Sequence, residues 1–118
     1  MKSENKILDL TFEFSLQIIS LYKLLLGQKE FVISRQLLRC PTSIGANVEE
    51  ANAAQTKKDF IAKMSIASKE AREARYWLRL LDKSQLVKLE YSIYLNSIEH
   101  IINILTKIVK SSQESLIG

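Results

Sequence analysis

The segment RQLLRCPTSIGANVEEA, residues 35–51, keeps a helical pattern through the chain's single proline and one of its three glycines. Apolar residues that recur every three or four positions lie on one side of a helix. Across Pro41 this row keeps its phase: Ile33, Leu37, Cys40, Ile44, Val48 and Ala51. We therefore predict one helix bent at Pro41, although Pro41 cannot donate a hydrogen bond to Leu37. Thr42 and Ser43 are candidates to bond the backbone groups that the bend releases.

The stretch before this segment carries a similar apolar row. Its members share one side of a helix: Ile7, Thr11, Phe14, Ile18, Leu21 and Leu25. Gly27 follows the row. We expect Gly27 to end this helix in the left-handed conformation that glycine favours at a C-terminal cap.

The stretch after the segment begins with Thr56 and Asp59, a pair that resembles a capping box with Asp in place of Glu or Gln. Its apolar residues then repeat in the strict heptad spacing of a left-handed bundle: Phe60, Met64, Ala67, Ala71, Ala74, Leu78 and Leu81. The three alanines leave room for a neighbouring helix. We expect that helix to come close at Gly45 and Ala46.

A fourth stretch completes the pattern with the row Tyr91, Leu95, Ile98, Ile102, Leu105 and Val109. The tail SSQESLIG is expected to fray. We predict helices at about residues 4–26, 31–54, 57–82 and 86–111, with short connections that make neighbouring helices antiparallel. The whole chain, residues 1–118, is predicted to form one domain with an all-α, antiparallel up-down four-helix bundle.

The composition narrows the class of protein. Cys40 is the only cysteine, so no intramolecular disulfide can form, and we expect a small buried residue in a reducing compartment. The apolar N-terminal stretch is interrupted by Asp9, Glu13 and Lys23 and lacks a cleavage site for a signal peptide. These features predict a soluble, cytoplasmic protein that does not enter a membrane.

The chain lacks the parts of an active site. His100, the single histidine, has no Ser, Cys or carboxylate partner at an evident spacing, and we expect it on the surface. A glycine-rich phosphate loop, a CxxC pair and an HExxH motif are all missing. Asn47, Glu49 and Glu50 lack the companion residues of a carboxylate metal site. We predict no catalytic residues, no metal, no cofactor and no small-molecule substrate.

Positive charge is concentrated in residues 57–83, which hold eight basic and four acidic residues, while the rest of the chain holds nine of each. Seven of these basic residues share about 120° of a helical wheel and are called the basic face below: Lys57, Lys58, Lys69, Arg72, Arg75, Arg79 and Lys83. A row of one sign along a helix is typical of a surface that contacts a phosphate backbone. The alternatives are a solvated face, or a set of partners for acids such as Glu49 and Glu50.

Apolar and aromatic residues also lie outside the main rows, which favours a subunit interface because Trp and Tyr outside a core are typical of recognition surfaces. The candidate interface residues are Phe12, Ile19, Gly45, Asn47, Ile66, Trp77, Tyr94 and Ile101. The alternative is a wide core face. We expect a homo-oligomer in solution.

Residues 31–81 closely resemble the signature of the four-helix-bundle proteins known as 23S rRNA intervening-sequence proteins. The matching positions are Ser34 to Leu38, Thr42 to Ala51, Asp59 and Phe60, Ala67, Lys69 to Ala71, and Tyr76 to Leu81. The resemblance implies a homopentameric bundle, in a family named after genes inside segments inserted into 23S rRNA genes. A related group, the accessory proteins of diversity-generating retroelements, forms basic pentamers that bind nucleic acid and a reverse transcriptase.

One departure from the family pattern is Cys40-Pro41, where small residues are usual, so a sharper bend or a displaced helix start is expected. We interpret the quoted segment as a packing device in which Asn47 and Glu50 bond groups on the next helix, such as Arg75. The leading hypothesis is a non-enzymatic homo-oligomer that binds nucleic acid, in particular rRNA, through the basic face. The alternative is a protein-interaction scaffold that meets an acidic partner.

Overall fold

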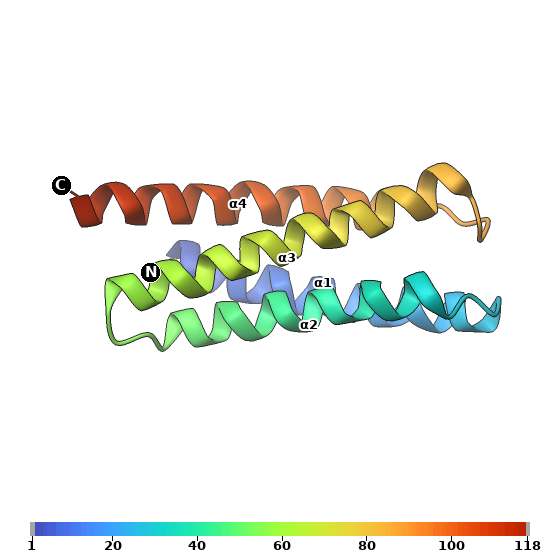
Figure 1. Cartoon of the computed structure of the whole chain (residues 1–118), viewed down its shortest axis with the longest axis horizontal. Coiled ribbons are helices and arrows are strands. Elements are labelled where there is room, and N and C mark those ends of the chain that lie inside the picture. Colours follow the sequence, from blue (N-terminus) through green and yellow to red (C-terminus); the bar gives the residue numbers. More distant parts are fainter. Residues whose placement is uncertain (1, 118) are drawn as a thin grey trace.

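Four helices, each packed against its neighbours in the sequence, make up the structure (Figure 1). This computed structural model describes residues 2–117, and side chains from residue 6 onward. The helices are α1 (Lys2–Gly27), α2 (Val32–Asn52), α3 (Lys57–Ser84) and α4 (Ser92–Ile117). Successive helices run in opposite directions, and α1 also packs against α4. The all-α four-helix bundle is confirmed.

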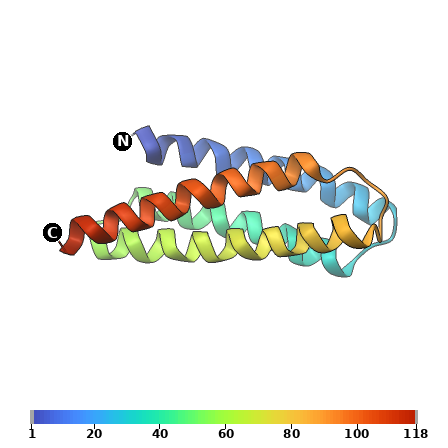
Figure 2. The ribbon, with the colours of Figure 1, turned by 90° about the horizontal axis from the view of Figure 1, so that it is seen from above.

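The bundle is long and narrow, with principal extents of 50 × 21 × 21 Å. Both termini lie at the same end, as Figure 2 shows. In Figure 1, α3 lies between α2 and α4, so one flank of α3 faces each of these helices.

The core contains the rows that the spacing predicted. The whole α1 row from Ile7 to Leu25 is buried, including Thr11, whose hydroxyl donates to the carbonyl of Ile7 at 2.8 Å. The α3 heptad row is also buried, except for the half-buried Phe60. Thr56 caps α3 by accepting the Asp59 amide at 3.0 Å, as expected from the capping-box pattern.

The stretch Lys6–Gly27 is long and apolar enough, by length and composition, to cross a membrane. In the bundle its main apolar row, including Phe14 and Ile18, is fully covered by the other helices. Core helices of soluble proteins and signal sequences pass the same test, and 28% of the stretch is buried inside the bundle.

Helix α2 continues through Pro41 without a break, which confirms one helix rather than two. Pro41 and Cys40 are both buried, so packing offsets a penalty of about 3 kcal/mol for an interior proline. The Ser15 hydroxyl of α1 donates to the Pro41 carbonyl at 3.2 Å, and the Thr42 hydroxyl donates to the Arg39 carbonyl at 2.8 Å. The Thr42 hydroxyl therefore bonds the carbonyl of Arg39 rather than that of Leu37, the group that Pro41 leaves without its helical donor.

The expected close approach of Gly45 to the α3 alanines is wrong. A Cβ atom built on Gly45 would meet only the Ser15 hydroxyl of α1, at 3.9 Å, and Ala46 is exposed. Gly45 therefore faces α1 and Ala46 faces solvent.

The predicted C-terminal cap of α1 is displaced by two residues. Gly27 is helical, and the left-handed residue is Lys29, at φ 62°. Backbone bonds from Lys29 N to Leu26 O (2.9 Å) and from Glu30 N to Leu25 O (2.9 Å) form a Schellman motif with Lys29 at its left-handed position.

The last helix begins at Ser92 rather than near residue 86. Tyr91 is fully buried and its hydroxyl donates to the Val87 carbonyl at 2.8 Å, while its own carbonyl accepts the Leu95 amide at 3.1 Å. Tyr91 therefore belongs to the apolar row but stands just before the helix, which explains the misplaced start. The tail was expected to fray, yet α4 continues to Ile117.

Candidate functional site

The basic face follows α3 along its outer side and along the flank toward α4. Six of its seven residues are exposed and Arg75 is half-buried. Three of them reach across to α4: Lys57 Nζ lies 2.9 Å from Ser115 Oγ, Arg72 Nη2 lies 3.2 Å from Thr106 Oγ1, and Arg75 Nη1 lies 3.1 Å from Glu99 Oε1.

Most of the charge on the basic face has no counter-charge among the side chains of residues 6–117. Among the side chains that the structure describes, only Arg75 of the basic face forms an ion pair. Glu50 pairs instead with Lys63, which lies outside the basic face, at 3.4 Å. The interpretation of the basic face as a set of partners for Glu50 is therefore wrong.

Glu50 bonds a basic group of α3, as expected, but that group is Lys63 rather than Arg75, and the expected bond from Asn47 to α3 is wrong. Asn47 Nδ2 donates to the Ser43 carbonyl of its own helix at 2.9 Å. Arg75 lies on the flank of α3 that faces α4, whereas α2 covers the opposite flank. Residues of α2 accordingly do not reach it.

A shallow hollow of about 260 Å³ lies between α3 and α4. Its lining combines polar and charged side chains with a comparable extent of apolar surface: Ser65, Ser68 and Arg72 from α3, and Thr106, Val109, Lys110 and Gln113 from α4. Two cations and no carboxylate line this hollow, which is called the α3–α4 hollow below.

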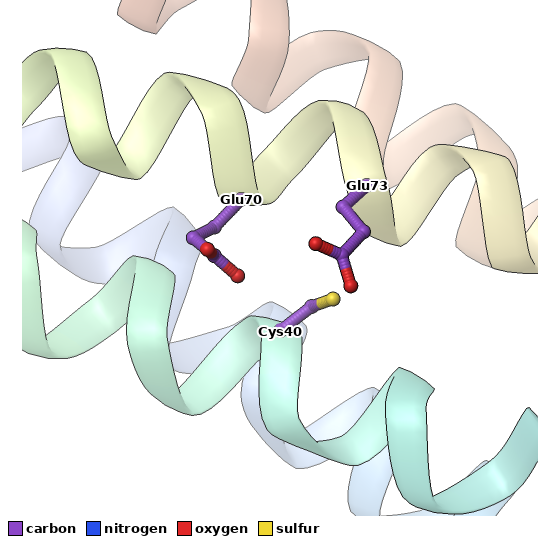
Figure 3. A group of neighbouring side chains, drawn as sticks. All are labelled: Cys40, Glu70 and Glu73. Carbon is purple, nitrogen blue, oxygen red and sulfur yellow. The ribbon is translucent and has the colours of Figure 1, made fainter.

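The opposite flank of α3 carries a second polar group. Glu70 and Glu73 of α3 point toward Cys40 of α2, as Figure 3 shows. Arg39 forms ion pairs with both carboxylates, at 2.9 Å to Glu70 and in close contact with Glu73. The indole N–H of Trp77 donates to Glu73 at 3.1 Å.

The electrostatics of this group follow from these contacts. The hydrogen bond from Trp77, with that from Arg39, holds the pKa of Glu73 below its usual value. Hydrogen bonds to Glu73 and Glu70 raise the pKa of Arg39. Burial, with the nearby negative charge of Glu73, raises the pKa of the Cys40 thiol to about 12.

The ligand atoms of Cys40, Glu70 and Glu73 lie within 4.8 Å of one another, a spacing that a metal ion could bridge. However, the Arg39 guanidinium already pairs with both carboxylates, and a thiol with a pKa of about 12 stays protonated at neutral pH. The group fits an arginine link between α2 and α3 rather than a metal site.

The candidate interface residues fall into three classes of exposure. Phe12, Ile19 and Ile66 are exposed, and Gly45, Asn47, Trp77 and Tyr94 are half-buried. Ile101 is only 1% exposed, so its assignment to a subunit interface is wrong: it belongs to the core of a single chain. Leu16 and Leu24 of α1, which the sequence reasoning did not single out, are 46% and 51% exposed.

The comparisons with known proteins agree with this architecture. The family model of the 23S rRNA-intervening sequence protein matches residues 3–107. The chain belongs to the 23S rRNA-intervening sequence protein family. The resemblance, which rested on residues 31–81, is thus confirmed and extends over α1 and most of α4.

A solved structure supports the same assignment. The crystal structure of a protein of unknown function from the S23 ribosomal protein family of Bacteroides thetaiotaomicron is 45% identical to this chain. The alignment covers 92% of this chain and 98% of that one, with a TM-score of 0.86. No curated protein matches the chain.

In this family member, the sequence predicted the basic residues on the α3 side of the α3–α4 hollow but not the polar residues on its α4 side. Polar residues recur on α4 at helical spacing toward α3: Glu99, Thr106, Lys110 and Gln113. A search for polar rows beside the apolar row would have found them. The link from Arg39 to Glu70 and Glu73 carries no comparable signal, because the partners lie on two helices.

Proposed function

We propose that this chain is a non-enzymatic, homo-oligomeric helical bundle that binds structured RNA through the basic face of α3. The observation that carries the proposal is a row of exposed cations of which one, Arg75, is paired with a described carboxylate. Cations without counter-charges in the chain release bound counterions when they contact phosphates, and this release drives binding to nucleic acid. The family's association with 23S rRNA makes an rRNA fragment the first target to test.

The proposal includes no catalytic role and places the protein in the cytoplasm. His100 is exposed on α4, and no described side chain forms a hydrogen bond with it. Cys40 is a free, buried thiol, which suits a reducing compartment.

Exposed apolar residues of α1 support the homo-oligomer, and the family resemblance implies a pentamer.

The test compares RNA binding by the wild type and by two triple variants, using fluorescence anisotropy with a 23S rRNA fragment at two salt concentrations. The first variant changes Lys69, Arg79 and Lys83 to alanine. These side chains are exposed and form no ion pair with a described carboxylate, so the fold should be kept. The control changes Lys23, Lys88 and Lys107, which are exposed elsewhere, and removes the same charge.

We expect steep salt dependence for the wild type and the control. Three lost phosphate contacts should flatten the salt slope of the first variant by about 2 to 3 units. Equal weakening of both variants would show a response to total charge rather than a binding face. If the wild type binds no RNA at low salt, the proposal fails and the alternative of a scaffold for an acidic protein takes its place.

A further inference from the structure

The α3–α4 hollow lies beside the basic face and adds to it a residue from another helix. Its α4 side contributes Lys110, together with Thr106 and Gln113. Lys110 belongs to a part of the chain in which basic and acidic residues balance, so charge counting does not point to it. The structure nevertheless places it on the same hollow as Arg72.

The Arg72 guanidinium is hydrogen-bonded to a neutral side chain, the hydroxyl of Thr106. Its Nη2 donates to the Thr106 hydroxyl at 3.2 Å, and it forms no ion pair with any described carboxylate. A guanidinium has five N–H donors, so one bond to Thr106 orients the group and leaves most of its donors free. Lys110 is also exposed and pairs with no described carboxylate.

Glu99, the α4 carboxylate that pairs with the basic face, is already engaged. Glu99 accepts from Arg75 through both oxygens, at 3.1 and 3.2 Å. It is not among the residues that line the hollow. The hollow therefore combines two cations that have no described counter-charge with hydroxyl and amide donors, which is the chemistry of an anion site.

We propose that the α3–α4 hollow seats one phosphate group of the bound nucleic acid, with Arg72 and Lys110 as its charged ligands. This inference rests on the proposed RNA-binding function and extends its footprint from α3 onto α4. A phosphate matches the forked donors of Arg72 and can accept from Ser65, Ser68 and Gln113 at the same time. The hollow of about 260 Å³ is open to solvent, so it can admit a phosphate that stays attached to the rest of the RNA.

The chain offers a matched pair of lysines for the test. Lys107 and Lys110 are both exposed on α4, but only Lys110 lines the hollow. Lys107→Ala and Lys110→Ala remove the same charge from the same helix. Binding of the 23S rRNA fragment is measured for both variants and the wild type across a salt series.

Loss of one phosphate contact should flatten the salt slope by about 0.7 to 0.9 and weaken binding roughly five- to eightfold at 0.1 M salt. We expect this change for Lys110→Ala, and a change of less than about twofold for Lys107→Ala. A second arm titrates inorganic phosphate into the isotope-labelled protein and follows backbone amide signals by NMR. We expect shifts at Ser65, Ser68 and Thr106 that are reduced in Lys110→Ala.

The possible failures are distinguishable. Equal binding losses in the two lysine variants, or phosphate shifts that avoid the hollow, would overturn this inference while RNA binding by the basic face still stands. Absence of RNA binding by the wild type would overturn the proposed function and the phosphate assignment together.

Discussion

At the scale of single residues, Cys40 shows how burial controls reactivity. Its thiol has a pKa of about 12 because it is buried next to Glu73. The thiolate is the reactive form, so at pH 8 native Cys40 should react with a thiol reagent about a thousandfold more slowly than a free thiol. We expect full labelling only after unfolding in guanidinium chloride. Rapid labelling of the folded protein would contradict this account of the site.

Glu73 predicts a pH dependence of stability. Its pKa is lowered in the folded chain by Trp77 and Arg39, so the ionised form stabilises the fold. This stabilisation is present above the unfolded pKa of about 4.3 and is lost as the pH falls through the lower folded value. Glu73→Gln should therefore destabilise the protein at pH 7 by about 1 kcal/mol or less, since the side chain is 36% exposed.

The measurement is urea unfolding of the wild type and Glu73→Gln at pH 7 and pH 3. The difference should shrink at pH 3, because below about pH 4.3 the carboxyl of the unfolded chain takes up a proton and unfolding becomes more favourable. Glu114→Gln, at an exposed position on α4, serves as the control. A difference of the same size at both pH values would assign the effect to packing rather than charge.

At the scale of elements, the turn after α1 contains a non-glycine residue, Lys29, in a strained left-handed backbone conformation. Lys29 occupies the left-handed position of the Schellman motif, at φ 62°, where glycine is usual. Lys29→Gly should raise the free energy of unfolding by about 0.5 to 1 kcal/mol, because glycine adopts this conformation without a steric penalty. Thermal unfolding checks this prediction, with the exposed Lys23→Gly, in the interior of α1, as a control that should destabilise.

The elements also show what sequence periodicity can and cannot predict. Rows of apolar residues gave the right helices because burial follows spacing, even across Pro41. Spacing gave the wrong start for α4, since Tyr91 fills the core from outside the helix. It also gave the wrong partner for Arg75, because the choice between Glu50 and Glu99 depends on which helix covers which flank of α3.

At the scale of the whole molecule, the bundle leaves an apolar row in solvent. Phe12, Leu16 and Ile19 follow one side of α1 at helical spacing and are 65%, 46% and 38% exposed. Contiguous exposed apolar surface on a folded chain is typical of interaction sites. A second copy of the chain is the partner that we expect there.

This expectation sets the last prediction. Light scattering of the wild type at micromolar concentration should give a multiple of the 13.5 kDa chain mass. Changing Phe12 and Ile19 to serine should shift the mass toward one chain, because the change removes apolar contact area between copies while the core row of α1 is left intact. Ile93→Ser, at a 57% exposed position on α4, should leave the mass unchanged. A wild-type mass of one chain would contradict the homo-oligomer, whereas a stable oligomer in the Phe12 and Ile19 variant would move the interface to another face, such as the one around Ile66.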